Sequence, residues 1–101
     1  MVTTSSNFLY GIPVNGGFQA AIFKPYDNVL VHLNDVISIE AQTNSSAIIE
    51  LYDNGSLINS TNASTILQHN LSVNTTGDHD IVMVAHDGTT TIYDTISYAV
   101  I

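Results

Sequence analysis

The stretch that decides the fold is Ala47-Ile48-Ile49-Glu50-Leu51-Tyr52-Asp53-Asn54-Gly55-Ser56-Leu57-Ile58, which describes two strands folded back on each other. A two-residue type I′ turn needs a positive φ at both central positions, which Asn tolerates and Gly adopts freely. Asn54-Gly55 between apolar runs therefore predicts a β-hairpin. We expect Ile49 and Leu51 to face the interior and Glu50 and Tyr52 to face outward, or the reverse if the register slips by one residue.

Strands are also expected on both sides of this hairpin. Residues 36–42 alternate with period two, which places Ile37, Ile39 and Ala41 on one face. Further strands are expected at residues 18–23, 28–33, 64–73, 78–86 and 89–101, with a polar bend at residues 59–63. Two more shared faces are expected, one formed by Leu67, Leu71 and Val73 and the other by His79, Ile81, Met83 and Ala85.

This spacing, with Gly, Asn, Asp or Pro at every turn and no helical period, predicts an all-β antiparallel β-sandwich of about seven strands. Its immunoglobulin-like character is architectural, since the paired Cys and the Trp of immunoglobulin domains are absent. With 101 residues the chain suits one domain. We expect residues 1–16 to be an N-terminal arm or linker and residues 17–101 to form the sandwich.

The charge balance excludes some partners. Nine Asp and Glu face one basic residue, Lys24, for a formal net charge of -8. Nucleic acids and anionic membranes require clustered Lys and Arg, so neither is an expected partner. The negative net charge does not disfavour uncharged sugars, whereas it would repel acidic polysaccharides.

The composition favours a location outside the cell. Only 10% of the residues are charged, so Ser, Thr and Asn must cover the surface, as in many secreted and cell-surface β-domains. Residues 1–4 lack the basic and apolar regions of a signal peptide. We therefore expect a piece of a larger secreted protein rather than a cytoplasmic protein with its native start, and the apolar runs are too short to cross a bilayer.

Residues 35–101 resemble the bacterial immunoglobulin-like modules attached to secreted glycoside hydrolases. The matching motifs are the alternating strand at 37–41, the hairpin Tyr52-Asp53-Asn54-Gly55, and the run from Gly77 to Gly88 with its Ala85-His86-Asp87-Gly88 ending. With the strand after Gly17 and with Pro25, the chain is most similar to modules that accompany α-amylase-type catalytic domains. The family usually has Tyr at the position of His79, so the hydroxyl that ties a corner to the backbone is missing and a different polar contact is expected there.

The resemblance implies a non-catalytic accessory module of a polysaccharide-degrading enzyme, which either binds polysaccharide such as an α-glucan weakly or acts as a spacer beside neighbouring domains. Uncharged sugars are usually bound by aromatic rings that stack on them and by amides and carboxylates that bond their hydroxyls. The candidate rings are Tyr52, Tyr93, Tyr26 and Tyr10, and the candidate polar partners are Asn54, Asp53, Gln42 and Asp94. Equally, the tyrosines could cap sheet edges or pack under the arm.

A structural subunit of an extracellular filament or surface layer, whose arm pairs with a neighbour's edge strand, is the alternative function. No catalytic constellation or cofactor motif is recognised, so an enzyme is not expected. Metal binding is not expected either, because His79 and His86 should point to opposite faces of one strand and Asp35, Asp53, Asp87 and Asp94 suit turns. Six Asn-x-Ser/Thr sequons, starting at Asn44, indicate either surface glycosylation or chance in a chain rich in these residues.

Overall fold

The computed structural model describes residues 17–101. The predicted arm at residues 1–16, which includes Tyr10, lies outside the described residues. The described residues form six strands: β1 (Ala20–Lys24), β2 (Val29–Val31), β3 (Val36–Asp53), β4 (Ser56–Ser72), β5 (Gly77–His86) and β6 (Thr91–Val100). None of residues 17–101 belongs to a helix long and apolar enough to cross a membrane.

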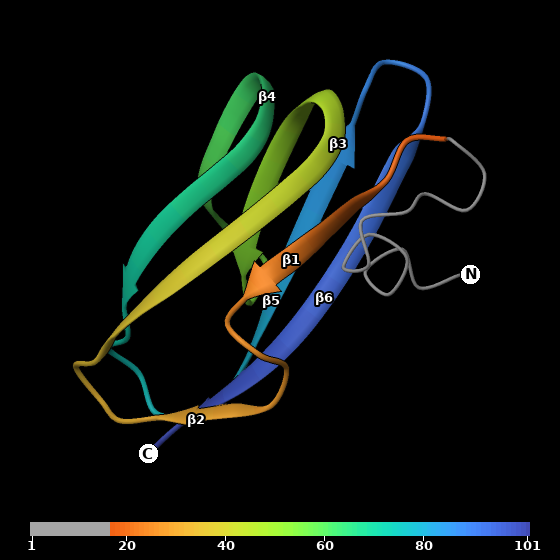
Figure 1. Ribbon diagram of the computed structural model, residues 1–101. Coiled ribbons are helices and arrows are strands. Elements are labelled where there is room, and N and C mark those ends of the chain that lie inside the picture. Colours follow the sequence, from red (N-terminus) through yellow and green to blue (C-terminus); the bar gives the residue numbers. More distant parts are fainter. Residues whose placement is uncertain (1–16) are drawn as a thin grey trace.

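Two long, bent strands, β3 and β4, run through both layers of the molecule (Figure 1). The first half of β3 pairs with β1 and with residues 66–72 of β4, whereas its second half pairs with β5 and with residues 56–61 of β4. The register shifts between Gln42 and Ile49, where β3 passes from one layer to the other. Irregular pairings of this kind bend a strand, so one hairpin supplies strands to both sheets.

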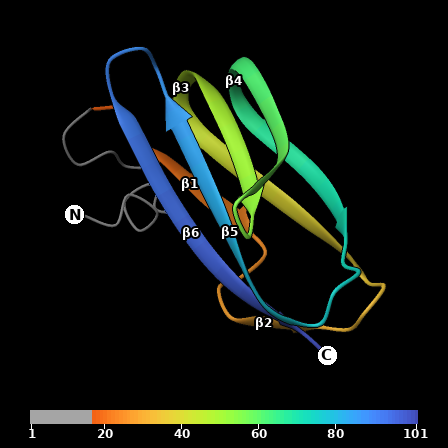
Figure 2. The ribbon, with the colours of Figure 1, turned by 180° about the vertical axis from the view of Figure 1, so that it is seen from behind.

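β5 and β6 complete the larger layer, and β1 packs against them across the interior without pairing (Figures 1 and 2). β2 pairs with β6 in parallel, with Val29 opposite Tyr98. This parallel pair departs from the purely antiparallel arrangement that we predicted. It arises because the loop after β1 carries the chain across to the β6 edge, where β2 runs in the same direction as β6. The predicted all-β, immunoglobulin-like sandwich is otherwise confirmed.

The central hairpin turns where the sequence predicts. Asn54 has φ 47° and Gly55 has φ 87°, the two positive values that a type I′ turn requires. Ile49 and Leu51 are fully buried, while Glu50 and Tyr52 are half-buried on the outer side, so the predicted register is confirmed.

The prediction that a polar bend at residues 59–63 separates two strands is wrong. β4 continues through it, and the chain accommodates the bend at Ala63, with φ 49°, inside the paired strand. Likewise β3 continues through residues 43–46. Residues 59–61 remain extended because they pair with residues 49–51 of β3, and Thr43 pairs with Ala20 of β1.

The core lies between the layers and follows the predicted alternation. Its largest fully buried side chains come from both layers: Ile39, Ile49, Leu51, Ile81, Met83 and Tyr98. The predicted faces of β4 and β5 also point inward, with Leu67, Val73 and Ala85 buried. Each fully buried aliphatic side chain of this size contributes roughly 1.5–3 kcal/mol, so this core is the main source of stability.

Candidate functional site

One outward face of the larger layer brings two predicted site residues together. Tyr52 of β3 lies opposite Val82 of β5, and Tyr93 of β6 lies opposite Val84 of β5. Glu50 lies opposite Val84 on its other side. Since alternate residues of a strand share a face, these five side chains form one surface, which we call the tyrosine face (Glu50, Tyr52, Val82, Val84 and Tyr93).

β5 lies between the two tyrosines, and their partners on it, Val82 and Val84, are two residues apart. The Cα atoms of the tyrosines are therefore roughly 12 Å apart. Tyr93 is 64% exposed, whereas Tyr52 is half-buried against its neighbours. This spacing exceeds the width of one pyranose ring. A chain of sugar residues is long enough to contact both side chains, and the partly buried Val82 and Val84 lie between them.

The hydroxyl of Tyr52 has a defined orientation because it donates to Glu50 Oε1 at 3.2 Å. Partial burial and the charges of Glu50 and Tyr93 raise the pKa of Tyr52. Tyr52 is therefore a neutral phenol at ordinary pH. Glu50 adds a carboxylate that can accept hydrogen bonds from hydroxyl groups beside the rings.

Apolar side chains extend the tyrosine face on both sides. Leu57, opposite Tyr52 on β4, is 55% exposed. At the other end, Ile48 and His86 lie opposite each other and line a hollow of about 370 Å³ that also includes Ser46 and Asp87. The surface thus combines apolar contact area with a few polar groups at its ends, the usual composition of a binding site for neutral ligands.

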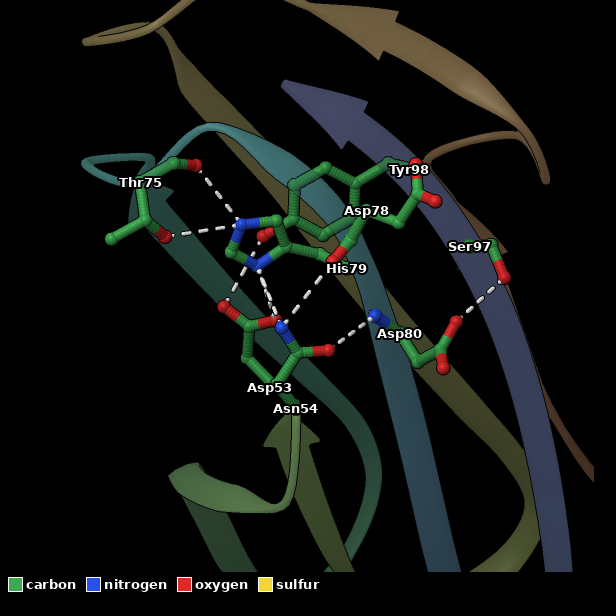
Figure 3. Close-up of polar contacts among 8 residues, drawn as sticks. All are labelled: Asp53, Asn54, Thr75, Asp78, His79, Asp80, Ser97 and Tyr98. Atoms are coloured by element: carbon green, nitrogen blue, oxygen red, sulfur yellow. Dashed lines mark hydrogen bonds and ion pairs between the residues drawn. The ribbon is translucent and has the colours of Figure 1, made fainter. Parts of the chain in front are cut away.

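Asp53 and Asn54 lie next to Tyr52 in sequence but belong to a different environment, a polar cluster at the end of the sandwich (Figure 3). Asn54 Oδ1 accepts the Asp80 backbone amide at 2.8 Å, and the Asn54 backbone amide donates to the Asp80 carbonyl at 2.9 Å. Asp53 Oδ1 lies 3.1 Å from His79 Nδ1. These contacts fix the hairpin turn to the start of β5.

His79 takes the role that the resemblance assigns to a tyrosine hydroxyl. The ring is buried, and its Nε2 lies 3.0 Å from the Thr75 carbonyl and 3.1 Å from the Thr75 hydroxyl (Figure 3). The ring therefore ties the corner to the backbone four residues upstream, as a corner tyrosine does. The predicted different polar contact at His79 is confirmed.

Tyr98 completes the cluster, and the sequence analysis did not single it out. Its ring stacks on His79 with centroids 4.8 Å apart, and its hydroxyl donates to Asp53 Oδ2 at 3.2 Å. Burial, followed by the negative charge of Asp53, raises the pKa of Tyr98, so the hydroxyl keeps its proton. The alternation of Ile96, Tyr98 and Val100 was the available signal that this tyrosine is buried.

The other candidates lie elsewhere. Tyr26 is 85% exposed in the loop between β1 and β2, at the opposite end of the sandwich from the start of β6 (Figure 1). Gln42 bonds the Glu40 carboxylate on the outer side of the smaller layer. Asp94 accepts the Ile22 amide at 2.8 Å and so links β6 to β1. Neither Tyr26 nor Gln42 joins the tyrosine face.

The acidic residues divide into two groups. Asp35 and Asp87 accept backbone amides in their own turns, as predicted. The prediction is wrong for Asp53, which bonds the distant His79. Asp94 lies within β6 rather than at a turn, and its carboxylate accepts the amide of the adjacent Thr95 as well as that of the distant Ile22. Among residues 17–101 no group of three or more His, Asp or Glu side chains is arranged to hold a metal ion.

Solved structures show what this arrangement is similar to. Fibronectin(III)-like modules of CbhA from Clostridium thermocellum match with a TM-score of 0.67 at 19% identity, over 81% of this chain and 95% of that one. The CARDB domain of a Pyrococcus furiosus protein matches with a TM-score of 0.67 at 15% identity, over 83% of this chain and 94% of that one. The fold is fibronectin III-like.

This fibronectin III-like fold also occurs within an enzyme. The endo-β-1,4-mannanase from Thermotoga petrophila matches over 96% of this chain but only 22% of that chain, with a TM-score of 0.67 and 14% identity. No protein-family model and no curated protein matches the sequence. At these identities the likeness establishes the fold, and function must be argued from the surface.

Proposed function

We propose that this protein is a non-catalytic accessory module of a secreted polysaccharide-degrading enzyme, and that its tyrosine face binds a neutral polysaccharide. The observation that carries the proposal is the placement of Tyr52 and Tyr93 on one outward face with two valines between them. The mannanase match, in which this fold forms a fifth of a larger chain, supports the accessory role.

The rings would stack on the apolar faces of sugar residues, while Glu50 accepts hydrogen bonds from their hydroxyls. Attachment to a catalytic domain turns even a weak contact of this kind into a high local concentration of substrate. The net charge of -8 favours uncharged polysaccharides over acidic ones. Starch, as the α-glucan that the resemblance implies, and mannan, from the mannanase match, are the first ligands to test.

The experiment is affinity electrophoresis and calorimetry against starch, laminarin and mannan. Tyr52→Ala and Tyr93→Ala each remove one ring, and we expect each to weaken binding about five-fold, which corresponds to about 1 kcal/mol for one aromatic contact. Tyr26→Ala is the matched control, because it removes an exposed tyrosine of the β1–β2 loop, outside the tyrosine face.

Binding that is lost in Tyr26→Ala but retained in the other two variants would place the site at the β1–β2 loop and reject the tyrosine face. Absence of binding to every neutral polysaccharide would leave the module as a spacer. Asp53 and Asn54 have no part in this proposal, since their side chains already bond the polar cluster.

A further inference from the structure

The outer edge of β4 has no strand partner among residues 17–101. β4 pairs only with β3, and both ribbon views show it along one side of the molecule (Figures 1 and 2). An unpaired edge presents a row of amides and carbonyls that another strand can bond. Proteins usually protect such edges with charges, Pro or short strands. β4 spans 17 residues and contains no Asp, Glu, Lys, Arg or Pro.

The hydrogen bonds show which backbone groups of β4 point away from β3. The Val73 amide donates to the Asp35 carbonyl, toward β3. Because bonding direction alternates along an antiparallel strand, residues 67, 69 and 71 also bond β3, and residues 66, 68, 70 and 72 point outward.

Two side-chain contacts agree with this assignment. Ser64 Oγ bonds both the amide and the carbonyl of Ile66, at 3.2 and 2.9 Å. Asn59 Nδ2 bonds the Gln68 carbonyl at 3.3 Å. Side chains of β4 therefore bond some of the outward backbone groups of the same strand. The outward groups of Asn70 and Ser72, both exposed, receive no such contact from the described residues.

The charge distribution indicates the partner. All nine acidic residues and Lys24 lie outside residues 54–77, so the β4 edge is the neutral side of a chain with net charge -8. Glu40, the carboxylate directly opposite Gln68, is bonded by Gln68 and Gln42. Copies of this chain repel each other wherever acidic surfaces meet, and they approach along β4 with the least repulsion. A basic partner would find no carboxylate on this strand.

We propose that residues 68–72 of β4 pair in antiparallel fashion with the same residues of a second copy of this chain. A two-fold axis through Asn70 places Asn70 opposite Asn70 and Gln68 opposite Ser72 of the other copy. The outward groups of these residues then form about six interchain hydrogen bonds. All the facing side chains are uncharged and able to hydrogen-bond each other, and the small area makes the dimer weak and concentration-dependent.

The test uses sedimentation equilibrium of the full chain over a wide concentration range. Wild type should dimerise, whereas Asn70→Asp places two like charges on the symmetry axis and should weaken the dimer at least ten-fold. Asn70→Lys should act in the same way. Thr89→Asp adds the same charge in the turn before β6 and should leave the dimer unchanged. Circular dichroism establishes that each variant is folded.

Mixing supplies the decisive measurement. An equimolar mixture of Asn70→Asp and Asn70→Lys should restore dimers, because opposite charges then face each other across the axis. A wild type that stays monomeric at millimolar concentration, dimerisation of Asn70→Asp equal to that of wild type, or a mixture that stays monomeric would each overturn the proposal. The last result would show that Asn70 of one copy does not face Asn70 of the other.

Discussion

Replacing Asp53 by Ala tests whether the polar cluster holds the end of the sandwich together. The Asp53 carboxylate accepts the Tyr98 hydroxyl at 3.2 Å and contacts His79 Nδ1 at 3.1 Å. Tyr98 is only 2% exposed, so its hydroxyl cannot turn to water once the acceptor is removed. A buried donor left without its acceptor costs about 1–3 kcal/mol, and the lost contact to His79 adds about 1 kcal/mol.

We therefore expect Asp53→Ala to lower the free energy of unfolding by about 2–4 kcal/mol. For a domain of this size that change lowers Tm by about 10–25 °C. Urea unfolding followed by far-UV circular dichroism and tyrosine fluorescence measures it. Asp87→Ala is the control: its carboxylate bonds two exposed backbone amides in a turn, and its loss should cost much less.

A double-mutant cycle isolates the contact itself. Tyr98→Phe removes only the hydroxyl, and in the Asp53→Ala background this change should cost about 1 kcal/mol less than in wild type, because its partner is already absent. Strict additivity of the two changes, or an Asp53→Ala variant as stable as Asp87→Ala, would show that the cluster does not stabilise the fold as described.

Two further substitutions test the hairpin turn and the dependence of stability on pH in the acidic range. Gly55→Ala places a side chain at a backbone φ of 87° and should lower the free energy of unfolding, measured in urea, by about 1–2 kcal/mol. Gly17 has no positive φ, so Gly17→Ala should leave the free energy of unfolding unchanged. Equal effects of the two substitutions would contradict the type I′ turn. The backbone amides of Thr90 and Thr89 lower the pKa of Asp87 below its ordinary value of 3.8. The stability that this carboxylate contributes is therefore present above pH 3.8 and lost as the pH falls through the lowered value. Asp87→Asn should therefore flatten the Tm profile below about pH 4, and an unchanged profile would contradict this assignment.

Local chemistry made much of the fold predictable. The turn at Asn54-Gly55 follows from the two residues alone, because few other pairs adopt two positive φ values easily. The inward set on each strand follows from alternation, as for Ile49 and Leu51. Sequence reasoning also placed Tyr52 outward and identified Tyr93 as a candidate ring. That they share one face depends on how β3 and β6 each pair with β5, which is a tertiary property.

The unpredicted features all depend on contacts between distant residues. The stretches at 43–46 and 59–63 are rich in Ser, Asn and Thr and are typical of loops. They stay in strands because residues 59–61 pair with residues 49–51 and Thr43 pairs with Ala20, partners that are distant or lie across the hairpin. Asp53 and Tyr98 are 45 residues apart, so no local pattern indicates their hydrogen bond. The alternation of residues 49–52 predicted that Glu50 faces outward, but only the structure shows its hydrogen bond with Tyr52.

The passage of β3 and β4 through both layers affects how the molecule comes apart. In a sandwich whose sheets are joined only by loops, one sheet can loosen while the other persists. Here each sheet includes half of the same hairpin, so separating the layers requires the hydrogen-bonded ladder of β3 and β4 to break as well. Opening of the interior is therefore coupled to melting of the hairpin, and the protein should unfold as one cooperative unit when it is stretched from its ends.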